Sequence, residues 1–197
     1  MHLTEGYIYH VYNRGNNKRP IFFSKENYLY FLKGMQKTIA PCCDILCWCL
    51  MPNHFHFLIH ANAQSVIEIN DLSFPRQQFS QAIKQLLSSY TKAVNKREGF
   101  TGSLFQQKTK ANCATTNIHV IFATTVFHYI HQNPIKAGLV KKMEEWDYSS
   151  FKDYAGLRNG KLCNKKLAFE LLDLNSKTIY KDSYGVINNE VLLKNLI

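Results

Sequence analysis

The run from Met51 to His60 (Met-Pro-Asn-His-Phe-His-Phe-Leu-Ile-His) constrains the fold of this chain more than any other segment. Apolar residues alternate with histidines, and this period of two predicts a β-strand with one buried face. Phe55 and Phe57 are expected to point into a core. His54 and His56 are then expected to lie side by side on the opposite face, about 7 Å apart along the strand.

Two imidazoles held side by side on a strand form half of a metal site, because imidazole is the commonest metal ligand among side chains. The alternative is that His54 and His56 are polar residues on the solvent-facing side of a sheet. The pair alone leaves both interpretations open, and the rest of the chain has to decide between them.

The length of 197 residues predicts one main domain, and the hydrophobic content of 46% is enough for a packed core. No apolar stretch reaches the 18 or more residues that a membrane span requires, and the N-terminus does not resemble a signal peptide. We therefore expect a cytoplasmic protein. The six cysteines form no C-x-x-C pair and are expected to be reduced and structural.

The net charge of +10 and the pI near 9.3 predict a polyanionic partner, most often nucleic acid. Between Arg76 and Lys110 there are seven basic residues and one acidic residue, Glu98. A solvated helix face would also explain such a charge run. The predicted phosphate contacts are Arg14, Lys18, Arg19, Arg76, Lys84, Lys92, Lys96, Lys108 and Lys110. Tyr12 and Phe105 are candidates for stacking on unpaired bases.

The predicted elements alternate in a way that is typical of an α+β domain. We expect strands over 7–13, 44–50, 54–60 and 103–113, and helices over 25–39, 76–97 and 118–132. Ser24 and Thr116 or Asn117 are the expected caps, and Asn133-Pro134 is expected to end the last helix. A polar linker is expected over 61–74. This order predicts an antiparallel sheet with helices packed on one side.

Tyr129, judged by its apolar neighbours alone, would be an ordinary core aromatic residue. Three blocks of the chain, however, stand in a familiar order and spacing. They are YHVYNRGNNKRPIF (9–22), MPNHFHFLI (51–59), and YIHQNPIKAGLV (129–140) followed by WDYSSF (146–151). This combination resembles the single-tyrosine HUH transposases, which are related to insertion-sequence-200-type elements, and among them the REP-associated tyrosine transposases. The resemblance covers roughly residues 6–154.

The resemblance implies a ferredoxin-like sheet with the histidines on a central strand. It implies that His54 and His56 are ligands of a divalent metal, Mg²⁺ or Mn²⁺, and that Tyr129 is the nucleophile. Asn133, one turn after Tyr129, would complete the metal site. It also implies a catalytic domain over 1–154, and it implies nothing for the extension over 155–197, in which short helices are expected at 167–172 and 189–197.

The implied function is that of a DNA transposase or single-strand endonuclease. Such an enzyme cleaves and rejoins hairpin-flanked single-stranded DNA through a covalent 5′-phosphotyrosine. The resemblance leaves a monomer and a homodimer open, because the tyrosine helix of insertion-sequence relatives can serve the partner's active site.

Two other interpretations remain open from the residues. One is a catalytically inactive nucleic-acid-binding protein derived from a transposase, which would need no metal. The other is a histidine-triad nucleotide hydrolase, suggested by His54, His56 and His60. Its pattern requires a histidine at the position of Leu58, and such an enzyme has no need of Tyr129. Metal affinity would separate the first alternative from the transposase.

Overall fold

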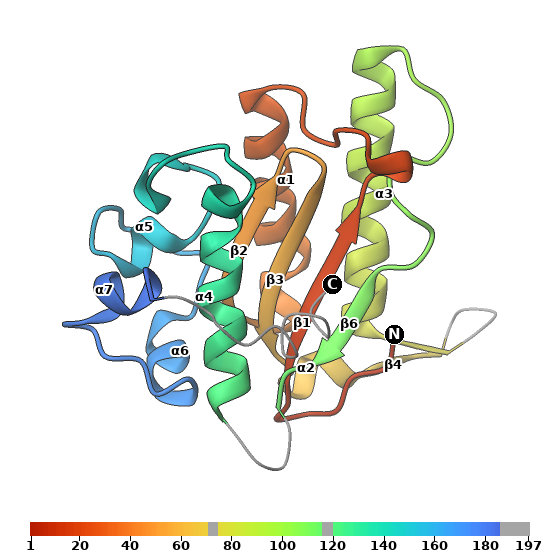
Figure 1. Ribbon diagram of the computed structural model, residues 1–197. Coiled ribbons are helices and arrows are strands. Elements are labelled where there is room, and N and C mark those ends of the chain that lie inside the picture. Colours follow the sequence, from red (N-terminus) through yellow and green to blue (C-terminus); the bar gives the residue numbers. More distant parts are fainter. Residues whose placement is uncertain (71–74, 116–119, 186–197) are drawn as a thin grey trace.

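The computed structural model describes residues 1–70, 75–115 and 120–185. Its centre is a four-stranded antiparallel sheet in the order β2-β3-β1-β6, and a separate two-stranded ribbon is formed by β4 and β5 (Figure 1). The strands are β1 (Ile8–Arg14), β2 (Asp44–Met51), β3 (His54–His60), β4 (Glu68–Ile69), β5 (Arg76–Gln77) and β6 (Lys110–Cys113).

The order β1-α1-β2-β3-α3-β6 is the β-α-β-β-α-β arrangement of ferredoxin-like folds, which confirms the predicted fold class. The helices are α1 (Lys25–Thr38), α2 (Ala63–Val66), α3 (Gln78–Glu98), α4 (Val120–Lys136), α5 (Phe151–Tyr154), α6 (Lys165–Leu171) and α7 (Ile179–Ser183). Three short 3-10 turns complete the elements: η1 (Asn16–Lys18), η2 (Ala40–Cys42) and η3 (Met143–Glu145).

Helices α1 and α3 pack on one face of the sheet, as predicted. Phe55 and Phe57 of β3 point to this face and are fully buried. Phe31 of α1 lies 5.5 Å from the ring of Phe55 and 4.9 Å from the ring of Tyr90 on α3. This aromatic core anchors β3, so the strand's other face is held in a fixed position.

The opposite face carries α4, which lies over β2 and β3, with β1 and β6 beside it (Figure 1). Cys47 and Leu58 from the sheet pack with Phe127 and other apolar side chains of α4. The C-terminal extension packs against the outer side of α4, where Thr124 Oγ1 donates to the carbonyl of Leu172 at 2.8 Å. The helix predicted at 167–172 is present as α6.

The end of α4 corrects the sequence prediction. Asn133-Pro134 was expected to stop the helix, but α4 continues to Lys136 with the proline inside it. A proline in the last turn removes few helical hydrogen bonds, so its cost there is limited. Gly138, at φ 68°, ends the helix, and the Leu139 N–H closes it on the Pro134 carbonyl at 2.9 Å. Asn133 therefore keeps helical geometry.

The strand predicted over 103–113 is also shorter than expected. Only Lys110–Cys113 pairs as a strand, although Phe105 forms an isolated bridge with Gly15. The side-chain amide of Asn13 donates to the Gln106 carbonyl at 3.1 Å and to Thr109 Oγ1 at 2.9 Å. These bonds hold 103–109 as a loop against β1 instead of a ladder.

The predicted linker 61–74 contains structure of its own, because Asn62 caps α2 and β4 follows. The expected caps Thr116 and Asn117 and the expected helix 189–197 lie outside the described residues. No helix in the described part of the chain is long and apolar enough to cross a membrane. All six cysteines are free thiols, and Cys42, Cys43, Cys47 and Cys49 are buried.

His131 of α4 makes the fold sensitive to acid. Its Nε2 lies 2.8 Å from Ser150 Oγ, and burial, with a smaller contribution from His128, lowers its pKa to about 3. The unfolded chain binds this proton near pH 6.5, so the stabilisation is complete above that pH and is lost as the pH falls towards 3. We expect His131 alone to cost about 2 kcal/mol of unfolding free energy between pH 7.5 and 5.

Urea unfolding at pH 7.5 and pH 5 measures this loss. His131→Gln retains a hydrogen-bonding side chain but cannot titrate. Its unfolding free energy should therefore change less with pH, because unfolding at pH 5 takes up about one proton fewer than in the wild type. The same pH dependence in the wild type and in His131→Gln would contradict the assignment. Other buried histidines keep their contribution in both proteins.

Candidate active site

A cavity of about 310 Å³ lies where β1, β3 and the C-terminal half of α4 meet. It brings together candidate residues from two separate segments of the sequence. His54 and His56 come from β3, and Tyr129 and Asn133 come from α4. The remaining lining residues are Tyr12, Asn13, Arg14, Met51, Gln106, Lys108, Lys110, Lys136 and Ala137.

His54 and His56 lie side by side with ring centroids 4.9 Å apart and ring planes at 89°. His54 Nδ1 is 2.6 Å from Asn53 Oδ1, and His56 Nδ1 is 2.8 Å from His10 Nε2. Both Nδ1 atoms are therefore engaged, and the Nε2 atoms are the ones available to a ligand. His56 Nε2 is buried and has no hydrogen-bond partner. An orphaned imidazole nitrogen of this kind suits a metal ion.

Both histidines are neutral near pH 7. Burial, with a smaller contribution from the charge of Arg14, lowers the pKa of His54 to about 4. Burial also holds the pKa of His56 well below its usual value, and the neighbouring His10, His54 and Arg14 act in the same direction. A neutral imidazole keeps the lone pair that metal coordination requires.

Tyr129 reaches the same cavity from α4, and its side chain belongs to the same chain as the histidines. Its ring is 5.9 Å from that of His56 at 80°, and the residue is 8% exposed. Burial raises the pKa of Tyr129, whereas a hydrogen bond from Asn133 and the charge of Arg14 lower it. Lys136 Nζ lies 5.3 Å from the ring centroid of Tyr129. A single chain thus brings together the phenol of Tyr129, the two histidines and the ammonium group of Lys136.

Asn133 lies one helical turn after Tyr129. Its Nδ2 donates to the carbonyl of Tyr129 at 2.9 Å. Its Oδ1, which carries the lone pairs of the amide, is the atom that could coordinate a cation. In the described part of the chain, no group of three or more His, Cys, Asp or Glu residues could hold a metal. A cation here would therefore be held by two imidazoles and an amide oxygen, with water or substrate oxygens completing its shell.

The charge of the cavity suits a phosphate group. Arg14, Lys108, Lys110 and Lys136 line it, and no aspartate or glutamate is among its lining residues. Lys110 also lies over the ring of Tyr12, with 5.6 Å between Nζ and the ring centroid. The cavity therefore offers positive charge beside an aromatic surface, which is the combination that binds unpaired nucleotides.

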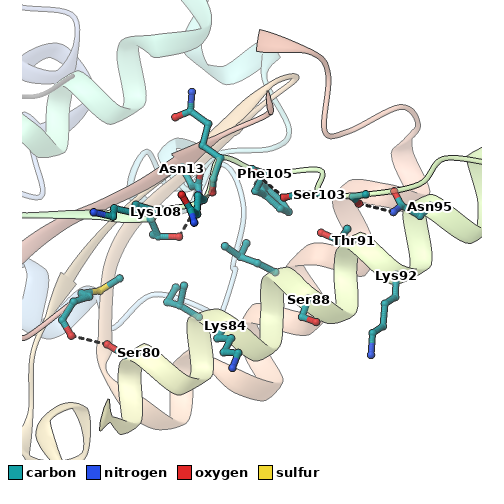
Figure 2. Close-up of a pocket in the computed structure, with 17 residues that line it drawn as sticks. Asn13, Ser80, Lys84, Ser88, Thr91, Lys92, Asn95, Ser103, Phe105 and Lys108 are labelled. Carbon is teal, nitrogen blue, oxygen red and sulfur yellow. Dashed lines mark hydrogen bonds between the residues drawn. The ribbon is translucent and has the colours of Figure 1, made fainter. Parts of the chain in front are cut away.

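The other predicted phosphate contacts lie outside this cavity. Lys84 and Lys92 line a larger groove along α3, together with Lys108 (Figure 2). Arg19 donates to the Ser103 carbonyl at 2.9 Å and Lys18 is exposed beside it. Lys96 is exposed near the end of α3, and Arg76 lines a separate cavity of about 410 Å³ at β5. Phe105, expected to stack on bases, is buried in the core instead.

Sequence reasoning missed His10 and Lys136 as parts of this site. His10 has the same strand parity as Tyr12, which faces the cavity, so the alternation of β1 did place it on the correct face. Its contact with His56 depends on the pairing of β1 with β3, which puts Tyr12 opposite His56. Lys136 was expected to lie beyond the end of the helix, whereas the helical continuation through Pro134 turns it towards Tyr129.

No protein-family model and no curated protein sequence matches this chain. Among solved structures it matches a REP-associated tyrosine transposase bound to a REP hairpin, with a TM-score of 0.58 and 15% identity over 82% of this chain and 87% of that one. It also matches a bacterial tRNA(His) guanylyltransferase-like protein in complex with GTP, with a TM-score of 0.37 and 9% identity over 71% of each chain. The second likeness is too weak to support an argument. The first shows that the chain has the fold of a REP-associated tyrosine transposase.

Proposed function

We propose that this protein is a metal-dependent tyrosine transposase that cleaves and rejoins single-stranded DNA beside a hairpin. The observation that carries the proposal is the meeting of Tyr129 with His54 and His56 in one cationic cavity. The shared fold supports it, because the matched transposase is bound to a hairpin. Here the DNA partner and the catalytic roles are inferred from the chemistry of the cavity.

The reaction begins with the phenol oxygen of Tyr129. This oxygen attacks phosphorus, the bond from phosphorus to the 3′ oxygen breaks, and the products are a 5′-phosphotyrosine and a free 3′-hydroxyl. The phenol gives up its proton and the leaving oxygen takes one, so protons balance. Burial raises the pKa of Tyr129 and so disfavours the phenolate. The positive charges of the Lys136 ammonium and the Arg14 guanidinium would oppose this effect and favour the phenolate.

Rejoining uses the same groups in reverse. A 3′-hydroxyl of another strand attacks the phosphotyrosine, and Tyr129 leaves with its oxygen. The phosphodiester energy is kept in the covalent bond, so no nucleotide cofactor is needed. Arg14, Lys108 and Lys110 would hold the phosphate oxygens in place during both steps.

The residues that would hold a divalent cation are His54, His56 and Asn133. When bound, such a cation supplies Lewis-acid polarisation of the scissile phosphate. Neutral imidazoles leave most of the charge of the ion uncompensated. Two nitrogen ligands suit Mn²⁺ better than Mg²⁺, which prefers oxygen.

A second candidate function is nucleic-acid binding without cleavage. The cavity and the neighbouring groove contain lysines and no carboxylates among their lining residues, so they would bind a polyanion without any metal. The histidine-triad hydrolase has less support, because Leu58 stands at the position of its middle histidine and is fully buried under α4.

A covalent-adduct assay separates these functions. Labelled hairpin DNA with single-stranded flanks is incubated with the protein and Mn²⁺, and the mixture is run on a denaturing protein gel. The transposase predicts a labelled protein band that requires metal. DNA binding in solution without a band in any tested hairpin would favour the binding protein.

A further inference from the structure

A groove of about 900 Å³ runs between α3 and the loop 102–109 (Figure 2). Helix α3 packs on the face of the sheet opposite α4, which carries Tyr129 (Figure 1). The lining of the groove contains three lysines, nine residues with hydroxyl or amide side chains, and no aspartate or glutamate. Of its three lysines, the proposed reaction uses only Lys108. The chemistry of the groove nevertheless matches a phosphodiester backbone.

One wall of the groove is a polar stripe on α3. Ser80, Lys84, Ser88, Thr91 and Asn95 recur at intervals of three or four residues, which places them on one side of the helix. Figure 2 shows these side chains along α3, with Thr91 and Asn95 next to Ser103 of the loop and Lys84 extending away from it. At 1.5 Å per residue the stripe is roughly 22 Å long, enough for several nucleotides of one strand.

The other wall is held in place by hydrogen bonds at both ends. Asn95 Nδ2 donates to the Gly102 carbonyl at 2.9 Å, and Asn13 Nδ2 donates to the Gln106 carbonyl and to Thr109 Oγ1. Phe105, from the middle of the loop, is buried in the core and fixes the segment between them. The groove is thus formed before any ligand arrives, which lowers the entropy cost of binding.

The groove continues into the candidate active site. Asn13, Gln106 and Lys108 line both the groove and the cavity that contains Tyr129. A strand lying along α3 would therefore pass Lys108 and enter the cavity without leaving a basic surface. Ile83 and Leu87 add apolar surface to the lining. Unpaired bases can cover such surface, whereas a duplex presents mainly phosphates to a groove.

We propose that this groove binds the single-stranded DNA segment that flanks the scissile phosphate and guides it into the cavity of Tyr129. The inference rests on the proposed function for the identity of the strand. Lys84, Lys92 and Lys108 contact its phosphates, and the hydroxyl and amide groups of α3 contact the backbone between them.

The test compares two double variants by fluorescence anisotropy, in chelator so that cleavage has no influence. Lys84→Gln/Lys92→Gln removes two groove charges, and Lys33→Gln/Lys37→Gln removes two exposed charges of α1 as the matched control. The probes are a labelled hairpin with single-stranded extensions on both sides and the same hairpin without extensions. Affinity is measured across a salt series.

We expect the groove variant to bind the extended probe about 10-fold more weakly at 0.1 M salt, with a salt slope smaller by about 1.4. The bare hairpin and the control variant should show no such change. An unchanged affinity for the extended probe, or an equal loss for both probes, would overturn the proposal. Since no cleavage is measured, failure of the transposase function would appear separately, in the adduct assay.

A second and independent observation concerns His10, which is fully buried on β1. The centroid of its ring lies 5.0 Å from that of His56 with the ring planes at 18°, so the two rings meet edge to edge, and one proton lies between His10 Nε2 and His56 Nδ1, which are 2.8 Å apart. His10 Nδ1 and His56 Nε2, the outer atoms of the pair, are both buried without a partner. The pair can therefore exist in two tautomeric forms with the same internal hydrogen bond.

Only one of these forms lets His56 bind a cation. When His56 Nδ1–H donates to His10, the Nε2 lone pair of His56 faces the cavity. When His10 donates, His56 carries its proton on Nε2 and cannot coordinate. We infer that His10 is a positioning residue, which accepts the Nδ1–H of His56 and orients that ring for the metal of the proposed function.

Mn²⁺ binding to the full chain, followed by electron paramagnetic resonance, tests this inference without DNA or activity. We expect His10→Phe, which keeps a ring but removes the acceptor, to weaken binding by about 10- to 100-fold. His10→Gln, which restores an acceptor, should recover most of the affinity. If His10→Phe fails to fold, ¹⁵N NMR of the wild type with Mg²⁺ reports the tautomer directly, and a proton on His56 Nε2 would overturn the inference.

Equal Mn²⁺ affinity in the wild type and His10→Phe would also overturn it, while leaving the proposed function intact. Absence of Mn²⁺ binding to the wild type would remove both. The two failures are therefore distinguishable in one titration.

Discussion

Tyr129→Phe is expected to abolish the covalent protein–DNA adduct and to lower the rate of strand cleavage by at least about 10⁴-fold. Phenylalanine keeps the aromatic ring beside His56 and under Lys136 but removes the oxygen that would bond to phosphorus. The fold should be preserved, because the ring and its packing against the neighbouring histidines remain. Binding of hairpin DNA should change little, since the cavity keeps its charges.

Tyr12→Phe is the informative comparison. Tyr12 lines the same cavity and lies 5.9 Å from His56, the same distance as Tyr129, so it is the other phenol within reach of the histidines. The adduct should persist in Tyr12→Phe and vanish in Tyr129→Phe. Loss of the adduct in Tyr12→Phe together with its survival in Tyr129→Phe would reassign the nucleophile.

The expected size of this effect follows from the surroundings of Tyr129, the proposed nucleophile. Burial raises the pKa of Tyr129, so the phenol is a weak nucleophile unless positive charge surrounds it. The cavity supplies that charge from Arg14, Lys136 and the cation that the histidines would hold. Water in the same cavity could replace the phenol as attacking group in Tyr129→Phe, but it would produce hydrolysis without an adduct. The gel readout therefore isolates the role of the tyrosine from general phosphate activation.

The arrangement around the histidines could be predicted from local sequence because a strand with alternating residues has only two faces. Once Phe55 and Phe57 enter the core with α1 and α3, His54 and His56 must share the other face. The α+β fold class could also be predicted, because the order of strands and helices can be read along the sequence. These inferences use contacts within a few residues, where the geometry is set by the backbone.

Contacts across the sheet could not be predicted in this way. His10 reaches His56 only because β1 pairs with β3 in the register that places Tyr12 opposite His56. That register joins two strands that are far apart in the sequence. No local pattern in β1 distinguishes a buried hydrogen-bond partner of His56 from an ordinary polar residue.

The error at Pro134 has a similar origin. Local preference disfavours a helix before proline, but the last turn of α4 is held by tertiary packing and by the Gly138 cap. Ile130 and Phe127 bury the helix against β2 and β3, which outweighs the bond lost at the proline. As a result, Asn133 stays one turn from Tyr129, and Lys136 Nζ lies 5.3 Å from the ring centroid of Tyr129.

His54→Ala is expected to weaken Mn²⁺ binding by more than roughly 10- to 100-fold. That range is the cost of losing a residue that only hydrogen-bonds to a ligand, as proposed for His10, whereas His54 would itself bind the metal. The adduct should disappear with it, while the affinity for hairpin DNA in chelator should be unchanged. His54→Ala is a cleaner choice than His56→Ala, because removing His56 would leave His10 buried without its partner, at about 1–3 kcal/mol of stability. The measurements are the Mn²⁺ titration and the adduct gel.

His60→Ala is the matched control for this change. His60 lies on the same strand and the same face as His54, but at the other end of β3, where its Nδ1 is 3.4 Å from Asp44 Oδ2. It is not among the residues that line the cavity. If the metal belongs to the cavity, His60→Ala should retain both Mn²⁺ affinity and the adduct, so that the loss in His54→Ala reflects position and not the number of histidines. Equal Mn²⁺ binding by His54→Ala and the wild type would instead exclude His54 as a ligand of the metal.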